Sequence, residues 1–473
     1  MSNTPLDGQK SEREKFGSRL GFILISAGCA IGLGNVYRFP VTTGAYGGGF
    51  FVLIYIAFLI LLGIPVMTCE LAVGRASQRS IATSFNVLQK PGQKWGFMKY
   101  LGIAGNYLLM MFYTVITCWM VIYFGKYLFG TMNTSTDAST LGGVFGSTVT
   151  NAGLNVAITF AVIIFGFGIC ALGLKNGVER ITKYMMLMLL FLLIGLAIYA
   201  CTLSGAKDGL SFYLIPSIEK LQETGVTTLV SSAMGQAFFT LSIGIGSIAI
   251  FGSYIGKERR LLGEAVTITS LDTCVALLAG FIIFPACFTF NGGQTADAGT
   301  VGASFLFTTL SATFNNMGSV GGRIVGTLFF LFMTFAAMST VIAVFENIVS
   351  FWLELTKLKR WQVCLINSGL MLVLVLPAIF GNSIWSGFSI NGKALMDMED
   401  FLVSNLLLPI GSFVYVLFCT RKFGMGYDKF DLEVNSGKGM KFPKWLRIYM
   451  QYVLPLIIIA VLVLTMLSYF GVA

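Results

Sequence analysis

The residues of this chain that could bind a small charged ligand lie inside apolar stretches. The first stretch contains AGCAIGLGNVYRFP at positions 27–40, where Gly28, Gly32 and Gly34 precede Asn35. Glycine weakens a helix, and asparagine adds a side-chain oxygen that can accept a hydrogen bond or bind a cation. This composition predicts an interrupted helix whose free peptide groups and side-chain oxygens hold the ligand.

A second stretch, AFFTLSIGIGSIAIF at positions 237–251, has the same character. Thr240 and Ser242 lie beside the step Gly244–Ile245–Gly246, again near the middle of an apolar run. Small residues four apart, as in the first stretch, are also common where two membrane helices pack closely. Close packing alone does not require side-chain oxygens at the same depth, so the polar residues favour two interrupted helices.

Three carboxylates also lie within apolar runs: Asp272, Glu70 and Glu346. Ionisable groups are costly inside a bilayer and usually functional. Asp272 is flanked by apolar residues in ITSLDTCVALLAGFIIF, and a bound cation is the simplest group that compensates its charge. For Glu70 two interpretations stay open, pairing with Arg75 and capping of loose backbone.

The residue types exclude several kinds of chemistry. The chain contains no histidine, which removes His-based triads and His-ligated zinc. No nucleophile–base pair is visible, so an enzyme is the weakest of the possible functions. The nine cysteines fall within apolar runs, where they are typical of small buried hydrophobic residues and not of disulfides or metal ligands.

Eleven apolar runs must position these residues. Of the 473 residues, 56% are apolar and 11% are charged, and the mean hydropathy is +0.81. Runs of about 20 apolar residues with few charges indicate membrane-spanning helices. We expect one all-α polytopic membrane domain with helices near 18–41, 50–73, 99–129, 154–174, 181–203, 229–255, 262–290, 322–354, 361–380, 396–420 and 446–471.

Lysine and arginine are distributed unevenly between alternate connections. If Met1 is cytoplasmic, 25 of the 31 cations lie on the cytoplasmic side, and the outer side keeps Arg38, Lys126, Lys207, Lys220, Arg323 and Lys393. This asymmetry follows the positive-inside rule. We expect a cell-membrane protein with a cytoplasmic segment at 1–17 and the C-terminus outside. Because topology accounts for the net charge of +10, the cations indicate no nucleic-acid partner.

The two interrupted helices are the first and the sixth. Interrupted helices at corresponding places in two halves point to an inverted-repeat secondary transporter that binds its solute at mid-membrane depth. The expected units are a first five-helix repeat at 18–203, a second repeat at 229–420 and an extra helix 11 at 446–471.

Longer segments carry a resemblance to a known family. SRLGFILISAGCAIGLGNVYRFP, followed by GGGFFVLIYIAFLILLGIPVMTCELAVGR, resembles the opening of the neurotransmitter:sodium symporter family. GQAFFTLSIGIG is similar to the sixth helix of that family, and the similarity covers helices 1 to 10. The resemblance is to the bacterial amino-acid transporters. It implies a LeuT-type fold, a 5+5 inverted repeat with helices 1 and 6 broken, and sodium-coupled import of amino acids or related amines.

The resemblance implies two Na⁺ sites. The first is built from oxygens of Ala30, Asn35, Thr240 and Asp272, the last at a position where many members have asparagine. The second combines three carbonyls with two hydroxyls, from Gly28, Ile31, Ala336, Ser339 and Thr340. Oxygen ligands suit a hard cation. For the two hydroxyls, hydrogen bonding to their own helix is the structural alternative.

The resemblance also implies a site for a zwitterionic amino acid. Its carboxylate would meet the amides of Leu33 and Gly34, the hydroxyl of Tyr113 and the first Na⁺, because exposed amides at a half-helix N-terminus favour an anion. The implied lining is Ala30, Leu33, Gly34, Leu109, Tyr113, Phe239, Thr240, Ser242, Ile245, Thr340 and Val344. The lining contains no charged side chain. We expect an apolar amino acid of the leucine, isoleucine or methionine class, with an aromatic side chain also allowed.

The resemblance implies gates at both ends of the site. Arg38 and Asp400 would form the outer latch, with Phe239 and Tyr113 as a lid beneath it. The inner gate would consist of Arg13, Glu354 and Tyr254. The alternative for the charged residues is that they are solvated, or snorkel, near helix ends.

Two departures from the family pattern affect the expected ions. Ala276 stands where chloride-dependent members often have serine, and Asp272 supplies a fixed negative charge nearby, so we expect no chloride requirement. A Gly-x₉-Pro element at the start of helix 5 keeps Gly177 but has Leu187 in place of proline. The resemblance therefore does not extend to sodium release by unwinding of that helix.

Other functions stay open on the same scaffold. Proton-coupled amino-acid transport would use Asp272 or Glu70 as the proton carrier. A nutrient-sensing membrane receptor would bind the amino acid without accumulating it, and a channel would lack the two gates. The sequence specifies no oligomeric state.

Overall fold

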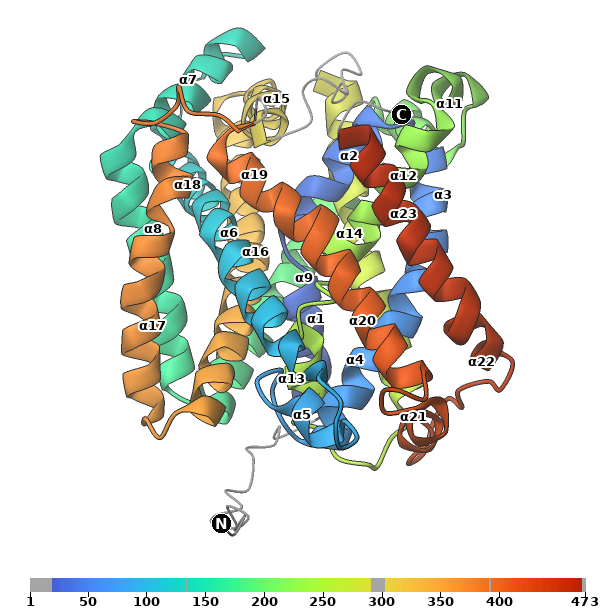
Figure 1. Ribbon diagram of the computed structural model, residues 1–473. Helices are drawn as coiled ribbons and strands as arrows, with labels where there is room; N and C mark the ends of the chain where they lie inside the picture. Colours follow the sequence, from blue (N-terminus) through green and yellow to red (C-terminus); the bar gives the residue numbers. More distant parts are fainter. Residues whose placement is uncertain (1–18, 133, 291–302, 391–392, 470–473) are drawn as a thin grey trace.

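Long apolar helices that run between the two ends of a bundle make up the described part of the chain (Figure 1). The structure is a computed structural model, and it describes residues 19–132, 134–290, 303–390 and 393–469. Within these residues α1 starts near the lower end of the bundle in this view, and α23 ends at the upper end (Figure 1).

The first half of the chain supplies eleven α-helices and four shorter helical segments of other types. They are α1 (Arg19–Ala30), η1 (Gly34–Arg38), α2 (Phe39–Ala45), α3 (Gly49–Phe58), η2 (Leu59–Gly63), α4 (Ile64–Ser77), α5 (Ser84–Leu88), η3 (Trp95–Phe97), α6 (Met98–Leu128), α7 (Ala138–Thr150), α8 (Ala152–Ala171), η4 (Leu174–Glu179), α9 (Arg180–Cys201), α10 (Ala206–Leu214) and α11 (Ile218–Thr224).

The second half begins with the two short helices that replace one span. The elements are α12 (Val226–Thr240), α13 (Ser247–Gly252), α14 (Leu261–Phe290), α15 (Ala303–Asn315), α16 (Ser319–Leu355), α17 (Arg360–Leu374), α18 (Leu376–Gly381), α19 (Leu395–Phe401), η5 (Leu402–Leu407), α20 (Leu408–Thr420), α21 (Tyr427–Val434), α22 (Leu446–Ile448), η6 (Tyr449–Val453) and α23 (Leu454–Tyr469).

Helices 1 and 6 are broken, as the sequence predicts. Nine helical segments of the described chain are long and apolar enough to cross a membrane by themselves. The pair α1 and α2 with η1 passes the same test only as one span, bent by 52° at its break. Helix 6 consists of α12 and α13, separated by residues 241–246. With these two interrupted spans, the described residues account for the eleven expected helices.

Proline explains most of the irregular helical turns. Four of the five π-helical segments, η1, η2, η5 and η6, end two residues before a proline, namely Pro40, Pro65, Pro409 and Pro455. Proline lacks the amide hydrogen and clashes with the carbonyl four residues earlier, so a wider turn accommodates it. The fifth segment, η4 at the start of helix 5, contains Gly177 and has no proline after it in α9.

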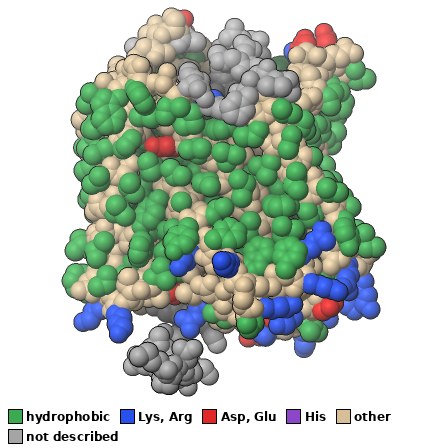
Figure 2. All heavy atoms as spheres, in the orientation of Figure 1, with side chains coloured by type: hydrophobic (Ala, Val, Ile, Leu, Met, Phe, Trp, Pro, Cys, Tyr) green, Lys and Arg blue, Asp and Glu red, His purple; other side chains and the backbone are tan. Residues whose placement is uncertain are grey.

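The centre of the bundle is formed by α6 and α16, which pack along each other, with α1 and α13 beside them. The outer helices expose large apolar side chains, for example Phe191 on α9 and Leu365 on α17. A broad hydrophobic band covers the face seen in Figure 2, and Lys and Arg side chains gather below it. This distribution is that of a multi-pass membrane protein.

Candidate functional site

The break in helix 1 exposes backbone that neighbouring side chains then bind. Between α1 and η1, the Gly32 amide donates to Asn35 Oδ1 at 3.2 Å and the Leu33 amide donates to the Tyr113 hydroxyl at 2.8 Å. A Cβ atom on Gly32 would lie 2.2 Å from the Tyr113 hydroxyl oxygen and 2.3 Å from Thr340 Oγ1. Only glycine allows this approach, so the break is a specific feature of the sequence.

The break in helix 6 has an equally specific backbone. Ser242, Gly244 and Gly246 adopt positive φ values of 50°, 104° and 80°. The Gly244 amide donates to Glu70 Oε1. Of the two interpretations that the sequence left open for Glu70, the structure therefore shows capping of loose backbone. The Ile245 carbonyl accepts from Asn106 Nδ2 at 3.0 Å. Side chains of α4 and α6 thus satisfy backbone groups that the broken helix cannot.

The two breaks are joined to each other. Ser242 Oγ donates to the Cys29 carbonyl at 3.3 Å, and Gln236 Nε2 donates to the Gly34 carbonyl at 2.7 Å. The breaks therefore form one polar region inside an apolar bundle.

One side of this region holds a cluster of buried oxygens around Asp272 on α14. Asn35 Nδ2 lies 2.8 Å from Asp272 Oδ1, and Thr240 Oγ1 lies 3.3 Å from Asp272 Oδ2. All three side chains are completely buried. Among the described residues, no Lys or Arg forms an ion pair with Asp272. An ionised carboxylate in such a place needs a compensating positive charge.

A second cluster of oxygens lies where α16 meets α1. Ser339 Oγ lies 3.2 Å from the Gly28 carbonyl and 3.3 Å from that of Ile31. Thr340 Oγ1 lies 3.1 Å and 3.4 Å from the same two carbonyls. Ser339 also donates to the Ala336 carbonyl of its own helix at 2.8 Å. Ser339 therefore bonds within its own helix and also contacts α1. The cluster contains five oxygens, two from hydroxyls and three from backbone carbonyls.

A small pocket adjoins the second cluster at Thr340 and the breaks of both helices. Its lining contains nine residues: Ala30, Gly32, Gly34, Leu109, Tyr113, Phe239, Ser242, Thr340 and Leu408. Seven of them are in the lining that the resemblance implies. Two are not, Gly32 and Leu408. The pocket carries no charged side chain, so its walls suit an uncharged side chain of a ligand.

Four residues of the implied lining lie outside the pocket wall. Leu33 lies in the break of helix 1 and bonds to Tyr113, and Thr240 ends α12 before the break of helix 6 and bonds to Asp272. The side chain of Ile245 packs over Gly105 of α6, and Val344 is fully buried in α16. Leu408 follows the π-helical segment η5, which changes the phase of helix 10, so a regular helical period does not predict it as a lining residue.

An ion pair lies beside Phe239, one of the residues that line the pocket. Arg38 Nη1 lies 3.2 Å from Asp400 Oδ1 and 2.9 Å from Ser404 Oγ. The Arg38 guanidinium also lies over the Phe239 ring, 4.5 Å from its centroid. Phe239 lines the pocket, so its ring lies between the pocket and the Arg38 guanidinium.

The residues expected at the inner gate have a different set of contacts. Arg13 lies outside the described residues. Glu354 accepts hydrogen bonds from the Ser80 amide at 2.6 Å and the Thr83 hydroxyl at 2.8 Å.

The hydroxyl of Tyr254 donates to Glu346 Oε1 at 3.1 Å. Glu346 in turn forms an ion pair of 2.5 Å with Arg360. The intramembrane acid Glu346 thus has a cation partner, whereas the described residues provide none for Asp272.

Comparison with known proteins gives consistent results. Residues 13–138 and 143–472 match the model of the sodium:neurotransmitter symporter family. An uncharacterized sodium-dependent transporter of Haemophilus influenzae is 30% identical over 96% of this chain and 98% of its own length. The uncharacterized sodium-dependent transporter YhdH of Bacillus subtilis is 32% identical over 94% and 96%. A crystal structure of MhsT in complex with L-phenylalanine is 33% identical, covers 96% of this chain and all of that chain, and superposes with a TM-score of 0.85.

Proposed function

The chain belongs to the sodium:neurotransmitter symporter family, and from this membership we propose that it imports an apolar amino acid together with two Na⁺ by alternating access. The family assignment makes it a sodium-dependent, multi-pass membrane transporter with a LeuT-type fold, and not an enzyme. The substrate class, the number of ions, the chloride independence and the orientation in the membrane are parts of the proposal.

The observation that carries the proposal is the buried Asp272 cluster beside an uncharged pocket. Asp272, Asn35 and Thr240 present oxygens without a neighbouring basic side chain in the described structure, and the Ala30 carbonyl would complete the set. Na⁺ prefers oxygen ligands, and the substrate carboxylate would add another. Ion and substrate then stabilise each other's binding, which is the physical basis of coupling.

The second ion would occupy the cluster formed by α1 and α16. Its ligands would be the carbonyls of Gly28, Ile31 and Ala336 and the hydroxyls of Ser339 and Thr340. Each Na⁺ gains about 2.3 kcal/mol from a potential of 100 mV and about 1.4 kcal/mol from a tenfold gradient. Two ions supply about 7 kcal/mol, enough for about five decades of accumulation.

The pocket and one relative support the proposed substrate class. Leu109, Phe239 and Leu408 offer apolar surface, and the pocket has no group that would neutralise a charged side chain. The MhsT structure holds L-phenylalanine, so the same fold accommodates an aromatic amino acid. Leucine, isoleucine and methionine are the first candidates, and phenylalanine is the next.

The proposal also includes two gates and an orientation in the membrane. Arg38 and Asp400 would close the outer path, whereas Arg13, Glu354 and Tyr254 would close the inner one. The end at which Lys and Arg gather would face the cytoplasm, with the C-terminus outside (Figure 2).

The decisive experiment is a binding screen of the twenty amino acids with purified protein, in Na⁺ and in K⁺, followed by uptake into proteoliposomes. We expect apolar amino acids to bind only in Na⁺ and to accumulate when a Na⁺ gradient points inward. Binding without accumulation would identify a sensor. Accumulation driven by a pH gradient without Na⁺ would identify proton coupling.

A further inference from the structure

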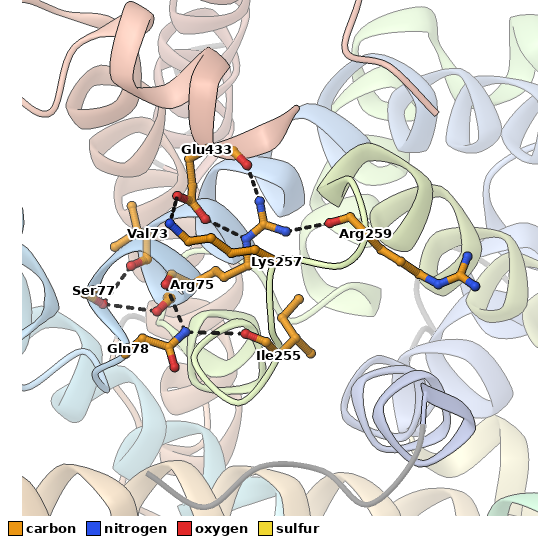
Figure 3. Close-up of polar contacts among 9 residues, drawn as sticks. Val73, Arg75, Ser77, Gln78, Ile255, Lys257, Arg259 and Glu433 are labelled. Carbon is orange, nitrogen blue, oxygen red and sulfur yellow. Dashed lines mark hydrogen bonds and ion pairs between the residues drawn. The ribbon is translucent and has the colours of Figure 1, made fainter. Parts of the chain in front are cut away.

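A fully buried arginine at the end of α4 is held by a carboxylate far away in the sequence (Figure 3). Arg75 Nε lies 2.6 Å from Glu433 Oε1, and its guanidinium also donates to the backbone carbonyl of Glu433. A third bond of 2.6 Å runs from Arg75 Nη1 to the Arg259 carbonyl. Lys257 Nζ lies 3.3 Å from the second carboxylate oxygen of Glu433. One carboxylate therefore compensates two cations.

Three parts of the chain meet at this carboxylate (Figure 3). Arg75 lies in the last turn of α4, residues 255–260 follow α13, and Glu433 lies on α21. The backbone strengthens the contact, because the Lys438 amide donates to the Glu258 carbonyl at 2.9 Å and the Arg260 amide donates to the Lys438 carbonyl at 3.1 Å. We call Arg75, Lys257, Glu433 and the pairing of 258–260 with 438 the Glu433 latch.

On one side of the latch, α4 and α13 behave as a single unit. A Cβ atom on Gly74 would lie 1.9 Å from the Ala249 carbonyl oxygen, and one on Gly252 would lie 2.7 Å from that of Leu71. Such backbone contact leaves no room for the two helices to slide past each other. Glu70 extends the unit into the site by holding the Gly244 amide.

On the other side of the latch, α21 is attached to helix 10. The Met425 amide, in the connection that leads to α21, donates to the Phe418 carbonyl of α20 at 2.8 Å. The latch thus joins the inner half of broken helix 6 to helix 10 through ionic groups and through the backbone pairing of 258–260 with 438. The Lys257 side chain is 65% exposed, so water reaches this edge of the contact and can solvate the charges when they separate.

We propose that Arg75 and Glu433 are positioning residues for transport, which hold the unit of α4 and α13 against α21 while the site is closed at this end. Release of solute toward this end requires α13 to move away from the site, because α13 begins directly after the break that supplies Ser242 to the pocket. The glycine contacts to α4 persist in that movement, and the latch separates. This inference rests on the proposed transport function.

A reversible cross-link tests whether the latch must open. Arg259 and Lys438 pair in a parallel bridge, so the double variant Arg259→Cys with Lys438→Cys can form a disulfide across the latch. We expect the oxidised protein to bind its amino acid in Na⁺ as the wild type does, while uptake falls by at least about tenfold and returns on reduction. The variants that carry only one of the two substitutions, Arg259→Cys or Lys438→Cys, are treated in the same way as controls.

Removal of the charge tests the opposite direction. Glu433→Gln should favour the arrangement that is open at this end and raise the apparent dissociation constant for Na⁺ by about tenfold. Hydrogen exchange should rise in 247–256, with the outer segment 303–315 unchanged. Asp428→Asn is the matched control, since it removes an exposed ion pair with Arg447 from the same helix α21. A purely structural role would instead lower the melting temperature and raise exchange throughout the protein.

The outcomes separate the two proposals. Wild-type protein without Na⁺-dependent binding or uptake would overturn the proposed function. Uptake at the wild-type rate by the double variant with its disulfide fully formed would overturn the latch alone. If Glu433→Gln does not fold, the reversible cross-link still decides the question.

Discussion

Asn35 donates hydrogen bonds to two oxygens of a single residue, Asp272, at 2.8 Å to Oδ1 and 2.9 Å to the backbone carbonyl. The same asparagine accepts a bond from the Gly32 amide through Oδ1. It therefore connects the break in helix 1 to a buried carboxylate on α14, and it aligns several oxygens on one small volume.

Replacing Asp272 with asparagine tests whether its charge binds Na⁺. The amide keeps the size of the carboxylate and can still accept from Asn35, but it removes the negative charge. We expect Asp272→Asn to weaken Na⁺-dependent amino-acid binding by at least about tenfold, or about 1.4 kcal/mol. Sodium titrations of binding measure the change. Asp208→Asn, an exposed acid on α10, is the control, and equal Na⁺ affinities in the two variants would contradict the assignment.

The same charge predicts the response to chloride. In the wild type, Asp272 supplies a fixed negative charge, and position 276 is alanine and not serine. Uptake should therefore be equal in chloride and in gluconate. In Asp272→Asn the site lacks a fixed anion, so chloride should increase uptake. Uptake by the wild type that collapses in gluconate would refute this prediction.

A second ion should be visible in the steepness of the Na⁺ dependence. Ser339→Ala removes one oxygen of the cluster between α1 and α16 without touching the pocket wall. We expect the Hill coefficient for Na⁺ to fall from about two toward about one. Thr334→Ala, which removes a hydroxyl that bonds only within α16 to Phe330 at 2.7 Å, should leave the coefficient unchanged.

The sequence predicted the parts of the fold that local composition controls. Glycine clusters in the middle of apolar runs located both broken helices, because hydrocarbon tolerates free backbone only beside a polar region. For Glu70, composition identified a costly buried acid, but its partner depended on how α4 packs beside helix 6. The structure supplied Gly244 as that partner.

Other features depend on contacts that one sequence cannot specify. Arg75 and Glu433 are 358 positions apart, and nothing in the composition of α4 names its partner. Leu408 follows a π-helical segment, so a regular helical period places its side chain on the wrong face. Both are consequences of tertiary packing.

The outer ion pair should control how long a bound amino acid stays. Arg38 and Asp400 are partly exposed, with 23% and 37% of their side chains accessible, so their pairing contributes only about 0–1 kcal/mol. Arg38→Gln also removes the contact with the Phe239 ring. We expect dissociation of the bound amino acid to accelerate up to about fivefold, as measured by isotope exchange. Lys220→Gln, in an exposed pair on α11, is the control and should have no effect.

Leu408 should determine which side chains the pocket accepts. It is buried, and it lines the pocket from helix 10. Leu408→Ala enlarges the pocket, so leucine loses contacts while an aromatic ring gains room. One methylene group more or less in contact with an apolar pocket changes the binding free energy of a ligand by about 1–3 kcal/mol. We expect the ratio of phenylalanine to leucine affinity to rise by about tenfold, measured by competition binding in saturating Na⁺. Leu406→Ala removes the same atoms outside the pocket wall and should leave the ratio unchanged. If both variants shift it equally, the selectivity comes from helix 10 as a whole and not from the side chain of Leu408.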